Sequence, residues 1–163
     1  MPPLDIANWL EPVAGDSPAG PNLEFDADFN ALDRAAQGKP EQQYGDTVIA
    51  AEEPDWKDVQ AQALALLERS RDLRVIGHLA VAKLHLGGLP EYTDVLSLAR
   101  QLIETRWDEV HPQLDPEDDN DPTLRANALL QLAHPGLVLK YLRSLPLANS
   151  PRLGRYSWRD IAL

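Results

Sequence analysis

Cysteine is absent from this chain of 163 residues, and no apolar run approaches the roughly 18 residues that a membrane-spanning helix needs. Without thiols the chain has no disulfide framework, no thiolate metal ligand and no thiol nucleophile. The first residues also lack the basic and then apolar order of a secretory signal peptide. These absences favour a cytoplasmic protein that does not insert directly into a membrane.

Basic side chains are scarce over most of the sequence. Residues 1–121 carry 9 basic and 25 acidic side chains, whereas residues 122–163 carry 6 basic and 1 acidic. The net charge of −11 argues against nucleic acid as a partner, because that binding begins with a basic footprint. The arginines of the last segment either form a small basic patch or offset the acidic body of the protein: Arg143, Arg152, Arg155 and Arg159.

Motifs that mark common enzyme classes are missing: no phosphate-binding glycine loop follows a strand, and no G-x-S-x-G elbow is present. His78 and His85 are seven residues apart, but two imidazoles on one helix face without a nearby carboxylate make a poor zinc site. The acidic run 115–121 resembles the start of a calcium loop, yet Asn120 stands in place of the required glycine. We therefore predict no cofactor, no metal and no catalytic residue.

Helical periodicity dominates the remaining pattern. It predicts helices over residues 6–10, 25–38, 55–69, 70–87, 90–106 and 122–133. Apolar residues surround the helix that begins near Ser70, so we place this helix at the centre of the fold. The Gly87-Gly88 pair ends it and Pro90 begins the next, which predicts antiparallel packing of the two helices.

Polar residues mark the starts of several predicted helices. We expect Ser70 to cap the central helix with Asp72 in its first turn, and the Asp121-Pro122 pair to open the helix after the acidic loop. Trp56 and Trp107 are expected in the core, although aromatic residues are also frequent anchors of interfaces.

Three stretches lack this helical rhythm. Residues 39–54 are predicted as a long loop, residues 137–145 fit a strand or a helix equally well, and residues 146–155 form a loop or hairpin tip. Ser157 and Asp160 have the spacing of a capping box near the last residue. A helix that opens there suggests that the chain is the front part of a longer protein.

Short motifs follow one another in order between Leu4 and Leu132. They are Asp16-Ser17-Pro18-Ala19-Gly20, Leu23-Glu24-Phe25-Asp26, Gly45-Asp46, Glu53-Pro54-Asp55-Trp56, Ser70-Arg71-Asp72-Leu73-Arg74-Val75, Trp107-Asp108-Glu109-Val110-His111-Pro112-Gln113-Leu114, Asp121-Pro122-Thr123 and Arg125-Ala126-Asn127-Ala128-Leu129. The ordered set resembles the N-terminal domain of the TssA (also called ImpA) proteins of bacterial type VI secretion. A weaker echo lies at Leu153-Gly154-Arg155-Tyr156-Ser157.

The resemblance singles out residues with a structural or an interaction role: Trp56, Ser70, Asp72, Leu73, Arg74, Trp107, Asp108, His111, Pro112, Asp121, Pro122 and Arg125. It implies a cytoplasmic, non-enzymatic assembly protein that is associated with the baseplate and with priming or capping of the tail sheath and tube. It also implies that the full-length protein forms homo-oligomers through a C-terminal region beyond these residues.

We predict a single all-α domain over residues 1–163, a compact bundle of about five to seven helices to which a small β-hairpin near residues 144–156 can be added. The loop 39–54 and the acidic loop 108–121 are the predicted docking surfaces for baseplate, sheath or tube proteins. One alternative is a membrane-anchored, sheath-capping accessory protein of the same family. The other is a carboxylate-dependent hydrolase, for which no spacing in the sequence predicts a site.

Overall fold

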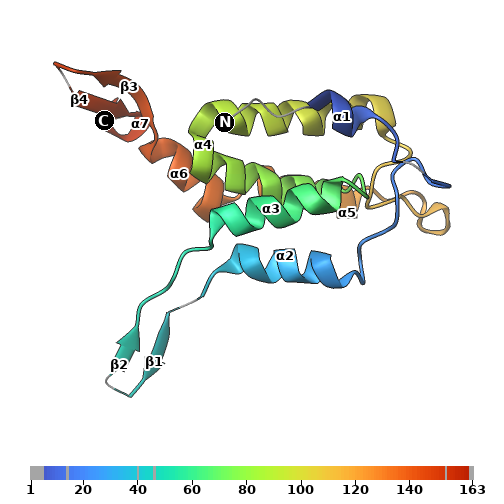
Figure 1. Cartoon of the computed structure of the whole chain (residues 1–163), viewed down its shortest axis with the longest axis horizontal. Helices are drawn as coiled ribbons and strands as arrows, with labels where there is room; N and C mark the ends of the chain where they lie inside the picture. The colour runs from blue at the N-terminus through green and yellow to red at the C-terminus, as the bar shows by residue number, and fades with distance from the viewer. Residues whose placement is uncertain (1–5, 14, 40, 46, 153, 162–163) are drawn as a thin grey trace.

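The computed structural model describes residues 6–13, 15–39, 41–45, 47–152 and 154–161 (Figure 1). Its α-helices are α1 (Ile6–Leu10), α2 (Ala27–Gln37), α3 (Trp56–Leu67), α4 (Leu73–Arg106), α5 (Thr123–Leu130), α6 (Lys140–Ser144) and α7 (Trp158–Ile161). Its strands are β1 (Gln42–Tyr44), β2 (Thr47–Ile49), β3 (Pro146–Ser150) and β4 (Gly154–Ser157). Helices α2, α3 and the two arms of α4 lie side by side and form the body of the molecule (Figure 1).

Helix α4 reverses direction in its middle, as the sequence predicts. Gly88 has a φ of 71° and a ψ of −156°, a backbone conformation that glycine adopts without steric cost. Pro90 then lies in the first turn of the second arm, where its missing N–H leaves no hydrogen bond unmade. The buried ammonium of Lys83 pairs with Glu91 at 3.0 Å across this turn. The reversal makes α4 an antiparallel pair of helices (Figure 1).

The first arm of α4 is the centre of the core. Nearly every residue from Leu73 to Leu84 is buried, which confirms the prediction of a helix packed on several sides. Val59, Ala63 and Leu67 recur every four residues on α3 and are also buried. Burial of each large aliphatic side chain contributes about 1.5–3 kcal/mol relative to exposure. The packing of α3 against the first arm of α4 is therefore a principal source of stability.

The first residues of two helices differ from the prediction. Asp72, not Ser70, is the N-cap of α4, because its carboxylate accepts a hydrogen bond from the Arg74 amide at 2.8 Å. Phe25 was included in the helix predicted over residues 25–38, but it lies before α2 and is 91% exposed. Asp26 caps α2 through the amides of residues 28 and 29, and this capping signal overrides the apolar spacing that includes Phe25.

The all-α prediction is correct for the helical body and wrong for the whole chain, because two antiparallel hairpins are present. Strands β1 and β2 pair within the segment predicted as a loop, and the ion pair of Lys39 and Glu52, at 2.6 Å, lies at their base. Each strand has three exposed residues, too few to show an alternating pattern. The pairing of β3 with β4 confirms the hairpin predicted near residues 144–156.

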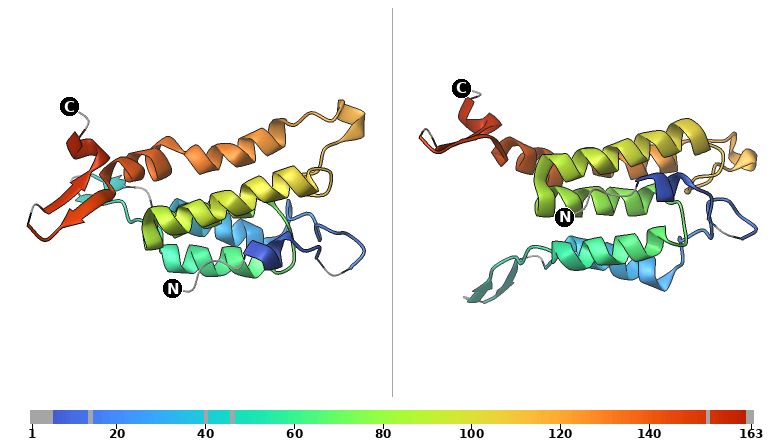
Figure 2. Two further views of the ribbon diagram at one scale, coloured as in Figure 1. Left: turned by 90° about the horizontal axis from the view of Figure 1, so that it is seen from above. Right: turned by 45° about the horizontal axis from the view of Figure 1, so that its top comes forward.

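Both hairpins project from the same end of the helical body, opposite the loop that includes residues 15–22 (Figure 2). The ambiguous stretch 137–145 is helical, with a π-helical turn at Pro135–Leu139 that runs into α6. The capping box is confirmed, because Asp160 accepts hydrogen bonds from the amide and the hydroxyl of Ser157 at 2.7 and 2.6 Å. Two residues of the quoted motifs, Asp46 and Leu153, lie outside the described residues.

Within the described ranges, no helix has both the length and the apolar character needed to cross a membrane.

Candidate functional site

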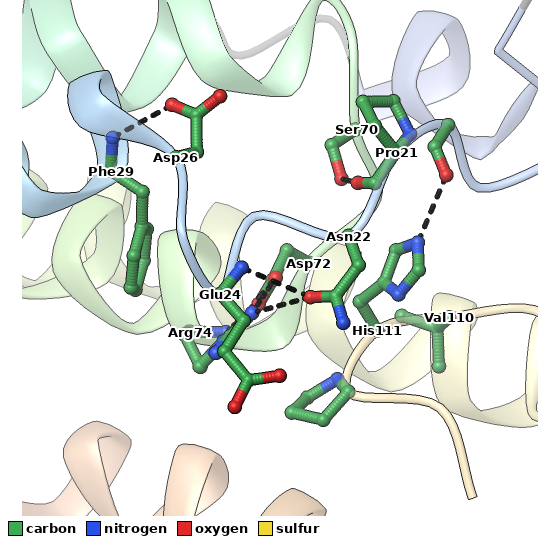
Figure 3. Close-up of polar contacts among 12 residues, drawn as sticks. Pro21, Asn22, Glu24, Asp26, Phe29, Ser70, Asp72, Arg74, Val110 and His111 are labelled. Carbon is green, nitrogen blue, oxygen red and sulfur yellow. Dashed lines mark hydrogen bonds and ion pairs between the residues drawn. The ribbon is translucent and has the colours of Figure 1, made fainter.

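Three segments distant in sequence meet at the end of the body opposite the hairpins. We call this meeting of residues 19–22, 69–74 and 107–112 the junction (Figure 3). The amide of Arg71 donates to the carbonyl of Ala19 at 2.7 Å, and the amide of His111 donates to the carbonyl of Arg71 at 2.9 Å. The amide of Leu73 donates back to the carbonyl of His111 at 2.9 Å. These main-chain hydrogen bonds join both ends of α4 to the N-terminal loop.

Two polar side chains of the junction contact main-chain carbonyls of the N-terminal loop. Ser70 donates from its hydroxyl to the carbonyl of Pro21 at 2.9 Å, and the Nε2 atom of His111 lies 3.0 Å from the carbonyl oxygen of Gly20 (Figure 3). A side chain at position 20 is excluded, because a Cβ atom there would lie 2.0 Å from the carbonyl oxygen of Arg69. The segments therefore approach each other as closely as the main chain allows.

Asp72 is 0% exposed, and its carboxylate is paired with a single cation, Arg74. Arg74 donates to its carboxylate from Nε at 3.0 Å and from Nη2 at 2.7 Å. The same guanidinium lies 4.8 Å from the ring centroid of Phe29 and 3.3 Å from the side-chain oxygen of Asn22. A buried carboxylate that is paired in this way is held by the structure and is not in contact with solvent.

Arg125 closes the junction from α5. Its guanidinium donates to the carbonyl oxygens of Pro112 at 2.6 Å, Val110 at 2.9 Å and Trp107 at 2.5 Å. The side chain is 1% exposed, and burial lowers the pKa of Arg125 while the nearby charge of Asp108 opposes that shift. One buried cation thus holds the whole turn between α4 and α5.

Trp107 was expected in the core, but it is 36% exposed. Its ring lies under the guanidinium of Arg125, with 4.4 Å between the ring centroid and the guanidinium carbon. The ring packs against a buried cation on one face, and this cation–π contact accounts for an aromatic residue at the end of a helix.

Most of the residues singled out from the sequence meet in the junction: Ser70, Asp72, Leu73, Arg74, Trp107, Asp108, His111, Pro112 and Arg125. Asp121 and Pro122 are exposed at the start of α5, where Asp121 accepts from the Thr123 amide at 3.0 Å. Trp56 is buried at the opposite end of the body.

Two arginines that sequence reasoning did not single out also belong to the junction. Arg69 makes two hydrogen bonds to Asp26, at 2.8 and 2.9 Å, and a third to Asp28 at 3.0 Å. Arg71 is buried and donates to the carbonyls of Leu67 and Glu11. Their partners lie up to 63 residues away along the chain, a distance over which no periodicity predicts a contact.

A pocket of about 1000 Å³ opens at the other end of the body, where the hairpins begin. The imidazole of His85 stacks between the rings of Trp56 and Tyr141, at centroid distances of 4.3 and 4.0 Å. Its Nε2 atom lies 3.0 Å from the carbonyl oxygen of Leu137, which fixes the ring. This aromatic stack forms one wall of the pocket.

Positive charge collects around this opening, which we call the basic pocket. Lys140 and Arg143 of α6 and Arg159 of α7 line it, together with Trp158 and Glu53. None of these three cations makes an ion pair within 4.0 Å to a carboxylate of the described residues. They therefore do not offset the acidic body of the protein through direct ion pairs.

The acidic loop has no such pocket. Within it, Pro116–Asp118 form a 3₁₀ turn capped by Asp115, and residues 115–121 are exposed. Across the described ranges, no three histidine, aspartate or glutamate side chains come together in a geometry that holds a metal ion.

Comparisons with known proteins agree on one family. A family model described as ImpA, N-terminal, type VI secretion system, matches residues 10–134. The type VI secretion system component TssA1 of Pseudomonas aeruginosa is 46% identical over 157 residues, which cover 96% of this chain and 45% of that protein. The chain therefore spans less than half the length of this curated relative.

A solved structure supports the same assignment. It is the N-terminal domain, with the conserved ImpA N-terminal region, of the TssA component of the type VI secretion system from Burkholderia cenocepacia. It is similar to this chain with a TM-score of 0.70 and 26% identity, over 99% of this chain and 58% of that one.

Replacement of Arg125 by methionine should lower the free energy of unfolding by at least about 3 kcal/mol, because three main-chain carbonyls of the junction lose their donor. Urea unfolding followed by circular dichroism measures the change. The control Arg100→Met removes an exposed arginine and should change the free energy by less than about 0.5 kcal/mol. Equal effects of the two substitutions would contradict the role assigned to Arg125.

The ion pair of Arg69 and Asp26 should make the free energy of unfolding depend on pH in the acidic range. The guanidinium holds the pKa of Asp26 at about 2, below its ordinary 3.8, so the pair stabilises the fold above about pH 4 and this contribution is lost towards pH 2. Asp26→Asn keeps a residue that caps helices but removes the charge. The variant should have a lower free energy of unfolding than the unaltered chain, by less than about 2 kcal/mol, and this difference should vanish near pH 2.

Urea unfolding at a series of pH values measures that deficit, with the exposed Asp16→Asn as the control. A deficit of Asp26→Asn that stays constant from about pH 5 to pH 2 would show that the ion pair contributes nothing.

Proposed function

This chain belongs to the ImpA N-terminal family of type VI secretion proteins, and we propose on that basis that it is a non-enzymatic docking module. In this proposal it binds baseplate, sheath or tube components in the cytoplasm while the secretion machine assembles. It is the N-terminal domain of a longer protein, which forms homo-oligomers through its C-terminal region.

The observation that supports this role best is the internal use of the motif residues. Asp72, Arg125 and His111 are the most deeply buried ionisable residues among them, and all three bind groups of the junction. A catalytic acid, base or nucleophile has to reach a substrate, and these side chains do not reach a cleft. The motifs therefore fit a scaffold whose binding surfaces lie elsewhere.

Two exposed regions are available as such surfaces. The β1–β2 hairpin, which replaces the predicted docking loop, displays the exposed side chains of Tyr44, Val48 and Ile49. Large apolar and aromatic residues are frequent anchors of protein interfaces, so this hairpin is a stronger candidate than the acidic loop. The basic pocket is the second region.

We expect an affinity-tagged copy of this chain to recover baseplate, sheath or tube proteins from a lysate of the source bacterium, identified by mass spectrometry. Each recovered protein is then purified and tested for direct binding, because a lysate also contains bridging proteins. Recovery of no secretion component by a bait with the circular dichroism of a folded helical protein would refute docking by this domain. In that case the function belongs to another part of the longer protein.

A further inference from the structure

The basic pocket has the size and rigidity of a binding site. Its volume of about 1000 Å³ lies at the upper end of the range for pockets that hold small ligands, and it accommodates several amino-acid side chains. The stack of Trp56, His85 and Tyr141 fixes one wall, since each ring restricts the movement of the next. Trp158 also lines the pocket, and this residue is 55% exposed.

The charge of the pocket departs from that of the protein. Lys140, Arg143 and Arg159 gather around it in a chain whose net charge is −11, and Glu53 is the acidic residue that lines it. Like charges that gather without a partner repel each other, so an anionic ligand would be bound favourably here. Arginine and tryptophan together are also the residue types most enriched at binding hot spots.

The pocket also differs from the junction in its relation to the family. The three cations and Trp158 lie beyond residues 10–134, the part that the family model matches. The junction residues lie inside that part. The junction therefore lies within the part that the family model matches, whereas the three cations of the pocket lie in the segment that follows it.

We propose that the basic pocket binds a short acidic segment of a partner protein, with an aromatic side chain against Trp158 and carboxylates paired with Lys140, Arg143 and Arg159. This inference rests on the proposed docking function and names the site and the chemistry of the partner. The occupant is a short peptide and not a nucleic acid, because the positive charge is confined to the pocket of a chain whose net charge is −11. A longer polyanion would have to run over the acidic remainder of the protein.

The direct test uses a short peptide blocked at both ends, with a central phenylalanine flanked on each side by aspartate and glutamate. A fluorescent label reports its binding to the 163-residue chain by anisotropy. We expect saturable binding that weakens as salt is added, and that falls at least about tenfold when Arg143→Glu and Arg159→Glu are combined. Both side chains are exposed, so the variant should fold, and circular dichroism checks this.

Matched controls separate the pocket from general charge effects. Arg100→Glu reverses an exposed charge on the second arm of α4 and should leave the affinity unchanged. A peptide with lysines in place of the acidic residues should bind the charge-reversed variant more tightly than the unaltered chain. Equal binding of the acidic peptide to both proteins, tighter binding of a single-stranded oligonucleotide, or the absence of saturable binding at about 1 mM peptide would overturn the proposal.

The same variant distinguishes this inference from the docking function. If the unaltered bait recovers secretion components and the charge-reversed bait recovers them equally, docking stands and the pocket is not its site. If the unaltered bait recovers secretion components and the charge-reversed bait does not, the pocket is the docking site.

Discussion

The guanidinium of Arg125 and the three carbonyls that it binds are the constraint on which the rest of this structure depends. Those carbonyls belong to the turn after α4. They can all bind the same guanidinium because the turn folds back on itself. The closed turn places His111 beside Arg71 and Leu73, where main-chain hydrogen bonds join the two ends of α4. The N-terminal loop is held in the same way, through the amide of Arg71. One buried cation therefore organises three distant segments.

The junction also fixes the geometry of the opposite end of the body. Helix α3 and the first arm of α4 run from one end to the other, and at 1.5 Å per residue the 12 residues of α3 span about 18 Å. Because these helices are packed along their length, their ends near Trp56 and His85 have a defined separation. The basic pocket and both hairpins are built on those ends. A rigid scaffold with exposed elements at one end suits a protein whose role is assembly.

Local signals in the sequence predicted a large part of this fold. Periodicity located helices α1 to α5 and left α6 undecided between strand and helix. Gly88 and Pro90 marked the reversal of α4, and the spacing of Ser157 and Asp160 marked the last helix. The β1–β2 hairpin was not predicted, because its short strands are exposed throughout and so show no alternating pattern. The contacts of Arg125 were not predicted for a different reason. Arg125 binds main-chain carbonyls up to 18 residues away, and neither residue type nor spacing in the sequence predicts such partners.

Native-state hydrogen exchange of the junction amides is the measurement that tests the central claim most directly. If the junction is the constraint on the fold, the amides of Arg71, Leu73 and His111 should exchange only through global unfolding, with the same opening free energy as the core amide of Leu79. Exchange of the junction amides at a much lower free energy, while Leu79 stays protected, would contradict the account. It would show that the helices pack together without help from the junction.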